Sequence, residues 1–242
     1  MYKAFADVYD TLMQDVDYAT WANYYISLLQ TYAPQAKNIM ECGCGTGALT
    51  QYFAEQYQTQ ALDISAEMLQ IAYNKMREAG AKVAFSNQDM RKFATHKPLD
   101  AVLATCDAVN YLTQAKDVEA FFTSANKALK AGGLLIFDVS SPYKLYTLLP
   151  SMPWVRTDEN ISYIWQNFVE EQILYMQISL FIKENGHYIR MEEEQQQCCF
   201  SQKEYTVMLQ NAGFDNIQFF GEQSKNPPQE RDSRWHVLAQ KK

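Results

Sequence analysis

A glycine-rich turn near residue 43 constrains the fold more than any other feature of the sequence. Gly43, Gly45 and Gly47 alternate with small residues directly after the apolar run at 39–40 and directly before a helical pattern at 48–55. This order is typical of a strand, a tight turn and a helix N-terminus. Because glycine has no Cβ and tolerates positive φ, such a turn brings backbone N–H groups close to a ligand. The turn therefore predicts a ligand site at the end of a strand.

Segments with strand and helix periodicity alternate around this turn. The pattern predicts strands over residues 38–41, 59–64, 82–87, 100–105 and 134–139. It predicts helices over residues 46–56 and 65–78, and a third helix that Thr113 caps and that the glycine pair at 132–133 ends. Because strands and helices alternate in this order, we expect a parallel sheet with right-handed crossovers.

The two ends of the chain extend this core. The stretch 2–32 is rich in aromatic residues and predicts two helices, the second capped by Asp17. A capping box at Ser201–Glu204 opens a late helix, and strands follow over 215–221 and 234–240, which permits an antiparallel hairpin at the sheet edge. The predicted fold class is α/β, a Rossmann-like seven-stranded, mostly parallel sheet sandwiched by helices.

A change of pattern marks an insertion in this core. Residues 153–200 show two-residue alternation with many β-branched and aromatic residues, and Asn185-Gly186 is a hairpin signal. We expect a core made of residues 1–152 and 201–242, with an N-terminal helical cover, and an antiparallel β insertion at 153–200. The insertion either shapes the substrate site as a lid or forms a homodimer surface, and the sequence leaves both readings open.

Composition narrows the classes of function. The chain has 21 Lys+Arg against 28 Asp+Glu, a net charge of −7 and a pI near 5.0, which works against a broad phosphate-binding face. We therefore expect a small-molecule partner and no nucleic acid. The five cysteines lack C-x-x-C spacing, which is typical of reduced thiols in a cytoplasmic protein without a metal site. No apolar run approaches the ~20 residues that span a membrane.

Acidic residues recur where the predicted parallel strands end, which is where open α/β sheets bind ligands. Gly43, Gly45 and Ala48 satisfy the dinucleotide fingerprint, and Asp63 follows near the place of its ribose-binding acid, so the glycines alone do not separate NAD from S-adenosylmethionine (SAM). Glu41 would repel a pyrophosphate, whereas SAM brings an ammonium and a sulfonium. The charge at this position therefore favours SAM.

The order and spacing of these segments resemble the class I SAM-dependent methyltransferases. The resemblance rests on residues 41–47, 62–65, 88–90 and 129–133, within about the first three-fifths of the chain. It implies S-adenosyl-L-methionine as cofactor and transfer of its methyl group to an O, N or C atom of a small-molecule acceptor.

The resemblance also implies cofactor-binding residues around the turn. Glu41 would lie near the methionine ammonium, and Gly43, Gly45 and Gly47 would carry the methionine part. Asp63 would hold the ribose hydroxyls.

Four further residues complete the predicted cofactor site. Asp89 and Met90 would meet the adenine. Met68 is expected to contact the adenine or ribose, with core packing as the alternative. Cys106, directly after the fourth strand, joins the set by its position at a strand end.

The candidate catalytic residues are Tyr9 and Asn110. The segment at 5–10 looks like the Tyr-Asp segment with which many small-molecule members of this family begin, and it places Tyr9 near the transferable methyl. Asn110 follows the fourth strand, where the family keeps substrate-facing residues, and a structural role in that loop is the alternative. Alignment and desolvation can drive methyl transfer without a general base.

Three alternative functions stay open at this point. An RNA or protein acceptor would keep the same cofactor site. A non-catalytic SAM-binding protein would keep the pocket without an acceptor. An NAD-dependent oxidoreductase would share the glycine turn, but the sequence has no clear constellation for hydride transfer.

Overall fold

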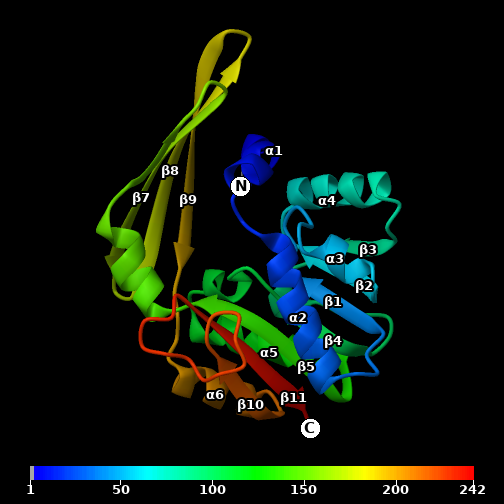
Figure 1. The fold of residues 1–242 in the computed structure, drawn as a ribbon. Helices are drawn as coiled ribbons and strands as arrows, with labels where there is room; N and C mark the ends of the chain where they lie inside the picture. Colours follow the sequence, from blue (N-terminus) through cyan, green and yellow to red (C-terminus); the bar gives the residue numbers. More distant parts are fainter. Residues whose placement is uncertain (1–2) are drawn as a thin grey trace.

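Two sheets organise the chain, which the computed structural model describes over residues 3–242 (Figure 1). The larger sheet has seven strands in the order β10-β11-β5-β4-β1-β2-β3. Its strands are β1 (Asn38–Cys42), β2 (Gln58–Asp63), β3 (Val83–Asn87), β4 (Leu99–Ala104), β5 (Leu129–Ser140), β10 (Phe214–Phe220) and β11 (Arg234–Lys241). The smaller sheet consists of β6 (Trp154–Thr157), β7 (Ile161–Glu170), β8 (Ile173–Glu184) and β9 (His187–Gln197).

Strand direction confirms the predicted fold class. The neighbours β1, β2, β3, β4 and β5 pair in parallel, while β11 runs antiparallel to both β5 and β10. The sheet is therefore Rossmann-like and mostly parallel, and the last two strands form the expected antiparallel pair at its edge.

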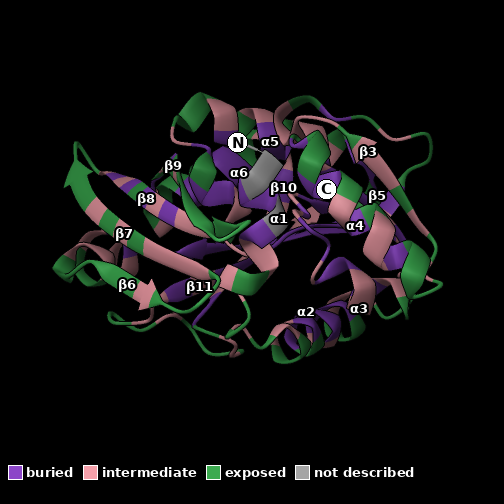
Figure 2. Ribbon diagram, turned by 90° about the horizontal axis from the view of Figure 1, so that it is seen from above, coloured by how far each residue is buried: buried purple, intermediate pink, exposed green. Residues whose placement is uncertain are grey.

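Helices cover both faces of the large sheet, because parallel strands must be buried on both sides. Figure 2 shows α2 and α3 on one side and α5 and α6 on the other. Along β5, Leu134 and Ile136 pack in the cluster with α2, while Leu135 and Phe137 pack in the cluster with α5 and α6. The helices are α1 (Lys3–Leu12), α2 (Tyr18–Tyr32), α3 (Thr50–Ala54), α4 (Ala66–Glu78), α5 (Ala115–Ala128) and α6 (Gln202–Asn211). Among the described residues, no helix combines the length and apolar character needed to cross a bilayer.

Three predicted boundaries are wrong. Residues 46–49 are not helical and α3 begins only at Thr50, because Gly47 has a φ of 77°, outside the helical region. Gln114, not Thr113, occupies the cap of α5. The glycine pair at 132–133 does not end a helix: it lies within β5, where an added Cβ at Gly133 would come within 3.1 Å of the Asp100 carbonyl.

The four-stranded sheet rises from the edge of the core as a long antiparallel ribbon (Figure 1). Asn185 and Gly186 join β8 to β9 with φ of 50° and 85°, which confirms the predicted hairpin and fits a type I′ turn. Ile178 and Leu180 on its inner face pack with residues of α1 and with Met68 of α4. Helix α1 therefore joins the inner face of this sheet to the core.

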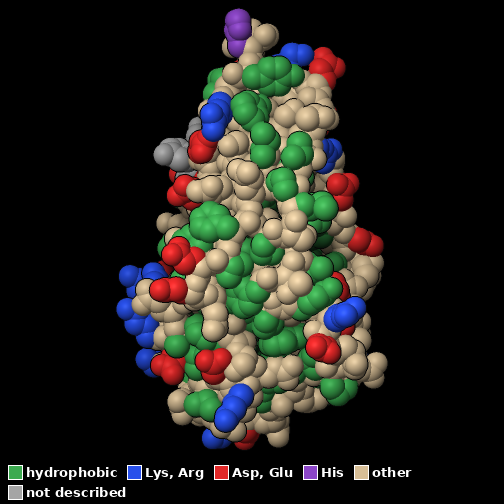
Figure 3. All heavy atoms as spheres, turned by 90° about the vertical axis from the view of Figure 1, so that its left-hand side faces the viewer, with side chains coloured by type: hydrophobic (Ala, Val, Ile, Leu, Met, Phe, Trp, Pro, Cys, Tyr) green, Lys and Arg blue, Asp and Glu red, His purple; other side chains and the backbone are tan. Residues whose placement is uncertain are grey.

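The outer face of the four-stranded sheet carries exposed apolar side chains. They include Val155, Ile164, Phe168 and Tyr188, and the Phe168 and Tyr175 rings stack at 5.0 Å. Figure 3 shows hydrophobic side chains spread along this face of the molecule. The use of this surface in a homodimer stays a prediction.

A histidine without hydrogen bonds lies inside the core near α2. His236 of β11 is fully buried, and neither ring nitrogen has a partner in the described part of the chain. Its ring packs against Tyr24 at 4.5 Å and Tyr25 at 5.5 Å. Burial lowers the pKa of His236 from 6.5 to about 4, so this histidine is a neutral packing residue.

Replacing this histidine tests its titration. Since the folded-state pKa lies below the unfolded one, the contribution of His236 to stability is present above about pH 6.5 and is lost as the pH falls through about 4. As the pH falls from about 7 to about 4, the free energy of unfolding of the wild type should drop by about 2–3 kcal/mol relative to that of His236→Phe. Urea unfolding at each pH measures this difference. A difference that does not change with pH would contradict this.

Candidate active site

A cavity of about 580 Å³ opens between the two sheets. One wall comes from the junction of β2 and α4, the opposite wall from β9, and the part between them from the segment after β4. The residues that line the cavity are Ile64, Ser65, Glu67, Tyr111, Thr113, Glu193, Glu194, Gln195 and Gln196. The carboxyl ends of β2 and β4 and the edge strand β9 of the antiparallel sheet therefore share one pocket.

The glycine turn folds back on β2. Gly43, Gly45 and Gly47 have φ of 72°, 52° and 77°, which explains the need for glycine at these positions. The N–H groups of Gly43 and Cys44 donate to the Leu62 carbonyl oxygen at 2.8 and 3.0 Å, and that of Gly45 donates to Asp63 Oδ2 at 2.8 Å. The hydrogen bonds that shape the turn therefore use these three N–H groups, and a contact of the turn with a ligand stays a prediction.

Gly45 is nevertheless the point where the turn faces open space. A Cβ added at Gly45 would meet no atom within 4 Å, whereas one added at Gly43 would lie 2.8 Å from the Ala108 Cβ. Gly43 thus serves close packing inside the protein, and Gly45 leaves room for a ligand.

Glu41 lies beneath the turn as a buried carboxylate. Its two oxygens accept hydrogen bonds from the hydroxyls of Thr50 at 2.5 Å and Thr105 at 2.8 Å. Burial raises the pKa of Glu41 to about 7, and the two threonine hydrogen bonds only partly oppose this. A cation bound above the turn would favour the ionised form of this side chain.

Asp63 ties the turn to the start of α4. While Oδ2 accepts from Gly45, Oδ1 accepts from the Ser65 N–H at 2.9 Å, and Ser65 Oγ caps α4. Burial raises the pKa of the Asp63 carboxyl. The next residue, Ile64, is 69% exposed and lines the cavity, a position that our sequence reasoning missed. An apolar residue between a strand-end acid and a helix cap is the signal that could have revealed it.

Asp89 and Met90 follow β3, next to the end of β2. Asp89 caps the short helix η1 (Met90–Lys92), and its carboxylate binds the Arg91 guanidinium at 2.7 Å, which lowers the pKa of Asp89. Met90 is partly buried against the main core. Met68 is buried between α1 and β8, the packing position given above as its alternative. Contacts of these three residues with adenine stay predictions.

Cys106 and Asp107 form an unusual turn after β4. Both are in the left-handed region, with φ of 54° and 55°, which is uncommon for residues other than glycine. The Asp107 N–H donates to Asp138 Oδ2 at 3.0 Å. Burial raises the pKa of the Cys106 thiol well above its usual range, so this thiol stays protonated.

A buried arginine holds this turn in place. Arg234 of β11 pairs with Asp107 at 2.6 Å and with Asp138 of β5. Its guanidinium also lies 4.5 Å from the centroid of the Trp21 ring. Burial alone would raise the pKa of Asp107, but Arg234 and other neighbours lower it to about 2. Our sequence reasoning missed this group; the charged residue at position 138, inside an apolar strand pattern, was its one visible signal.

Asn110 is fully buried in the short helix η2 (Ala108–Tyr111). Its Nδ2 donates to the carbonyl oxygens of Ser140 at 3.2 Å and Cys198 at 2.7 Å, and its Oδ1 accepts from the Ser140 N–H at 2.7 Å. The side chain therefore joins the ends of β5 and β9. The structure does not bring its amide to the cavity wall, and this arrangement fits the structural alternative.

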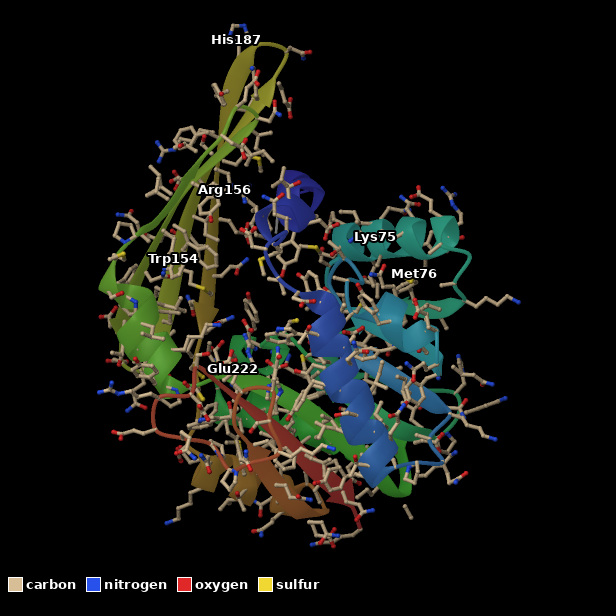
Figure 4. The ribbon with its side chains drawn as sticks, viewed as in Figure 1. Lys75, Met76, Trp154, Arg156, His187 and Glu222 are labelled. Atoms are coloured by element: carbon tan, nitrogen blue, oxygen red, sulfur yellow. The ribbon has the colours of Figure 1, made fainter. Side chains whose placement is uncertain are left out.

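Tyr9 is held over the strand ends by α1. The next residue, Asp10, accepts a hydrogen bond from the Thr46 hydroxyl at 2.6 Å and forms an ion pair with Lys75 of α4. Lys75 is labelled in Figure 4. Burial raises the pKa of Tyr9 well above its usual range, and nearby Tyr111 raises it further. The structure thus brings Tyr9 to the same region as the glycine turn, Cys106 and η2.

The raised pKa of Glu41 has a consequence for stability. Since its folded-state pKa of about 7 exceeds the unfolded value of 4.5, its contribution is present below about pH 4.5 and is lost as the pH rises through about 7. As the pH rises from about 5 to about 8, the free energy of unfolding of the wild type should fall by about 2–3 kcal/mol relative to that of Glu41→Gln. Chemical unfolding at each pH measures this difference. Parallel pH profiles for the two proteins would refute this.

The contacts of Asn110 predict a large cost for its removal. Asn110→Ala leaves buried backbone groups of Ser140 and Cys198 without partners, so the free energy of unfolding should fall by roughly 2–4 kcal/mol. Tyr111→Phe is the matched control, because it removes only one exposed hydrogen bond, to Gln195. Urea unfolding of both variants measures the difference, and equal small losses would speak against the structural role.

Similar proteins show the family to which the chain belongs. A sequence profile described as "Methyltransferase domain" matches residues 39–133, which include the glycine turn, Asp63 and Asp89. The chain is 33% identical over 245 residues to the putative methyltransferase YqeM of Bacillus subtilis (strain 168), covering 100% of this chain and 97% of that protein.

Two further proteins extend the comparison. The crystal structure of a S-adenosylmethionine-dependent methyltransferase from Clostridium acetobutylicum ATCC 824 matches with a TM-score of 0.90 and 29% identity, over 99% of this chain and 98% of that one. The dTDP-3-amino-3,4,6-trideoxy-alpha-D-glucopyranose N,N-dimethyltransferase of Streptomyces venezuelae is 29% identical over 136 residues, 55% of this chain and 56% of that protein. The chain belongs to the class I SAM-dependent methyltransferases and is an enzyme that uses S-adenosyl-L-methionine.

Proposed function

We propose that the enzyme transfers the SAM methyl group to a small polar molecule bound in the cavity between the two sheets. One observation carries this proposal: a single cavity has the β2–α4 junction as one wall and polar residues of the edge strand β9 as the other. The first wall suits the adenosine part of SAM and the second suits an acceptor. Such a pocket would bring the two reactants into contact.

The residues beside the first wall fit the cofactor. Gly45 faces open space at the turn, and Glu41 beneath it supplies the negative charge that the methionine ammonium requires. We assign the ribose to Asp63 and the adenine to the exposed side chain of Ile64 together with Met90. Because the Asp89 carboxylate is already bound by Arg91, we assign Asp89 to positioning this segment through its cap of η1.

Catalysis in this site rests on alignment. SAM supplies a methyl carbon that its sulfonium already activates, so the protein needs mainly to hold the acceptor in line and to exclude water. Tyr9 and α1 cover the strand ends for this purpose. We assign Asn110 a positioning role, because its amide fixes η2 between the ends of β5 and β9.

The nature of the second wall supports a small-molecule acceptor. Gln195 accepts the Tyr111 hydroxyl hydrogen bond at 2.9 Å, and Glu193 and Gln196 lie on the same strand. Amide, carboxylate and phenol groups in a cavity of about 580 Å³ suit a polar molecule of modest size. The relative from Streptomyces venezuelae, which acts on a sugar nucleotide by its name, agrees with this class of acceptor.

The open space at Gly45 provides a direct test. Gly45→Arg places a long cationic side chain where the cofactor would lie, so binding of SAM and S-adenosylhomocysteine should be lost. Gly80→Arg is the matched control, since Gly80 also has positive φ (68°, against 52° for Gly45) and an added Cβ there meets no atom within 4 Å. Isothermal calorimetry with S-adenosylhomocysteine measures both, and unchanged affinity in Gly45→Arg would overturn the assignment.

A further inference from the structure

Glu193 is a buried carboxylate on the acceptor side of the cavity. It lies on the inner face of β9, opposite Ile178 of β8, whose side chain packs against α1. Glu193 is only 8% exposed, and its remaining surface lines the cavity. The preceding residue, Glu192, points to the other face of the sheet, where its side chain is 59% exposed and pairs with Arg190.

This carboxylate has no cation as partner. Among the described residues, no Lys, Arg or His nitrogen lies within 4.0 Å of it. Its one hydrogen bond in that part of the chain is a long contact of 3.5 Å from the Gln195 amide, whose oxygen accepts from Tyr111. A buried carboxylate in such surroundings costs stability unless a ligand supplies the missing positive charge.

The charged residues that line the cavity indicate the charge of that ligand. Of the nine residues in this lining, Glu193 is a buried carboxylate on the inner face, Glu67 and Glu194 are exposed carboxylates at the rim, and none is Lys, Arg or His. A concave surface with this lining favours a cationic group of the ligand at this point. Glu41 and Asp63, the carboxylates that we assign to SAM, lie outside this lining, so Glu193 is the buried carboxylate left for the acceptor.

We propose that Glu193 receives the ammonium group of the methyl acceptor and so selects an amine as substrate. The proposal rests on the proposed function, because it concerns the same cavity. The charged contact would hold the acceptor nitrogen between β9 and the strand ends, with Tyr111 and Gln195 fixing the position of the carboxylate.

Methyl transfer in this arrangement requires the acceptor nitrogen first to lose a proton. The acceptor ammonium gives one proton to the Glu193 carboxylate, which leaves a lone pair on the nitrogen. That lone pair forms the new N–C bond while the C–S bond breaks and its electron pair stays on sulfur, giving S-adenosylhomocysteine. The methylated nitrogen carries the positive charge that the sulfonium lost, and the proton on Glu193 leaves to water.

A matched pair of probes tests the proposal on the full-length protein saturated with S-adenosylhomocysteine. D-glucosamine and D-glucose differ by an ammonium in place of a hydroxyl, and their dissociation constants are measured by ligand-observed NMR. We expect the wild type to bind the amine about tenfold more tightly, the size of one charge-assisted hydrogen bond. Glu193→Gln should reduce this ratio to about one, and Glu193→Asp should keep part of it.

Controls separate this role from structural and cofactor effects. Glu192→Gln, on the outer face of the same strand, should leave the ratio unchanged, and all variants should bind S-adenosylhomocysteine as the wild type does. No preference for the amine in the wild type, or a preference that survives in Glu193→Gln, would overturn the proposal. Weakened S-adenosylhomocysteine binding in Glu193→Gln would also overturn it, whereas a wild type that fails to bind S-adenosylhomocysteine would refute the proposed function itself.

Discussion

The structure depends on the buried pairing of Arg234 with Asp107 and Asp138. Asp138 also accepts the Tyr25 hydroxyl at 2.6 Å, and Asp107 accepts the Gln197 amide at 3.0 Å, so one cation joins β4, β5, β11, α2 and β9. Removing one partner of such a group would leave a buried charge uncompensated, which typically costs 3–5 kcal/mol. The contact also keeps two consecutive residues in a left-handed turn. The position of β9 relative to the ends of the parallel strands therefore depends on this buried ion pairing.

The acidic residues around the glycine turn differ in their pKa and in their hydrogen-bond partners, because each lies in a different environment. Glu41, buried and hydrogen-bonded only by hydroxyls, has a pKa raised to about 7, while Asp63 accepts two backbone N–H groups and shapes the turn. Asp89 is bound by Arg91. Three carboxylates that look equivalent as strand-end acids thus differ in their availability to a ligand, because the partners that surround each of them differ.

Much of the fold was predictable, since it follows from local patterns. The glycine turn, the alternation of strands and helices, the Asn185-Gly186 hairpin and the Ser201 capping box each depend on residues close in sequence. The pairing of Arg234 with Asp107 could not be predicted in this way, because it joins residues 127 positions apart. The buried role of Asn110 likewise depends on Cys198, which follows the four-stranded sheet and lies 88 positions away in sequence. Contacts of this kind require the tertiary structure.

The register of β9 has a consequence for how the acceptor wall can vary. Side chains alternate between the two faces of a strand, so a shift of one residue normally exchanges every inward group for its neighbour. In β9 the inward Glu193 is flanked by Glu192 and Glu194, and Gln195 is followed by Gln196. A slip of one residue in either direction would still place a glutamate at the level of Glu193. The level of Glu193 would thus keep its carboxylate. The same slip would, however, bring Arg190 or Glu192 to the level of Met191, which packs against the apolar cluster of α1, so that apolar contact and not the carboxylate holds the register.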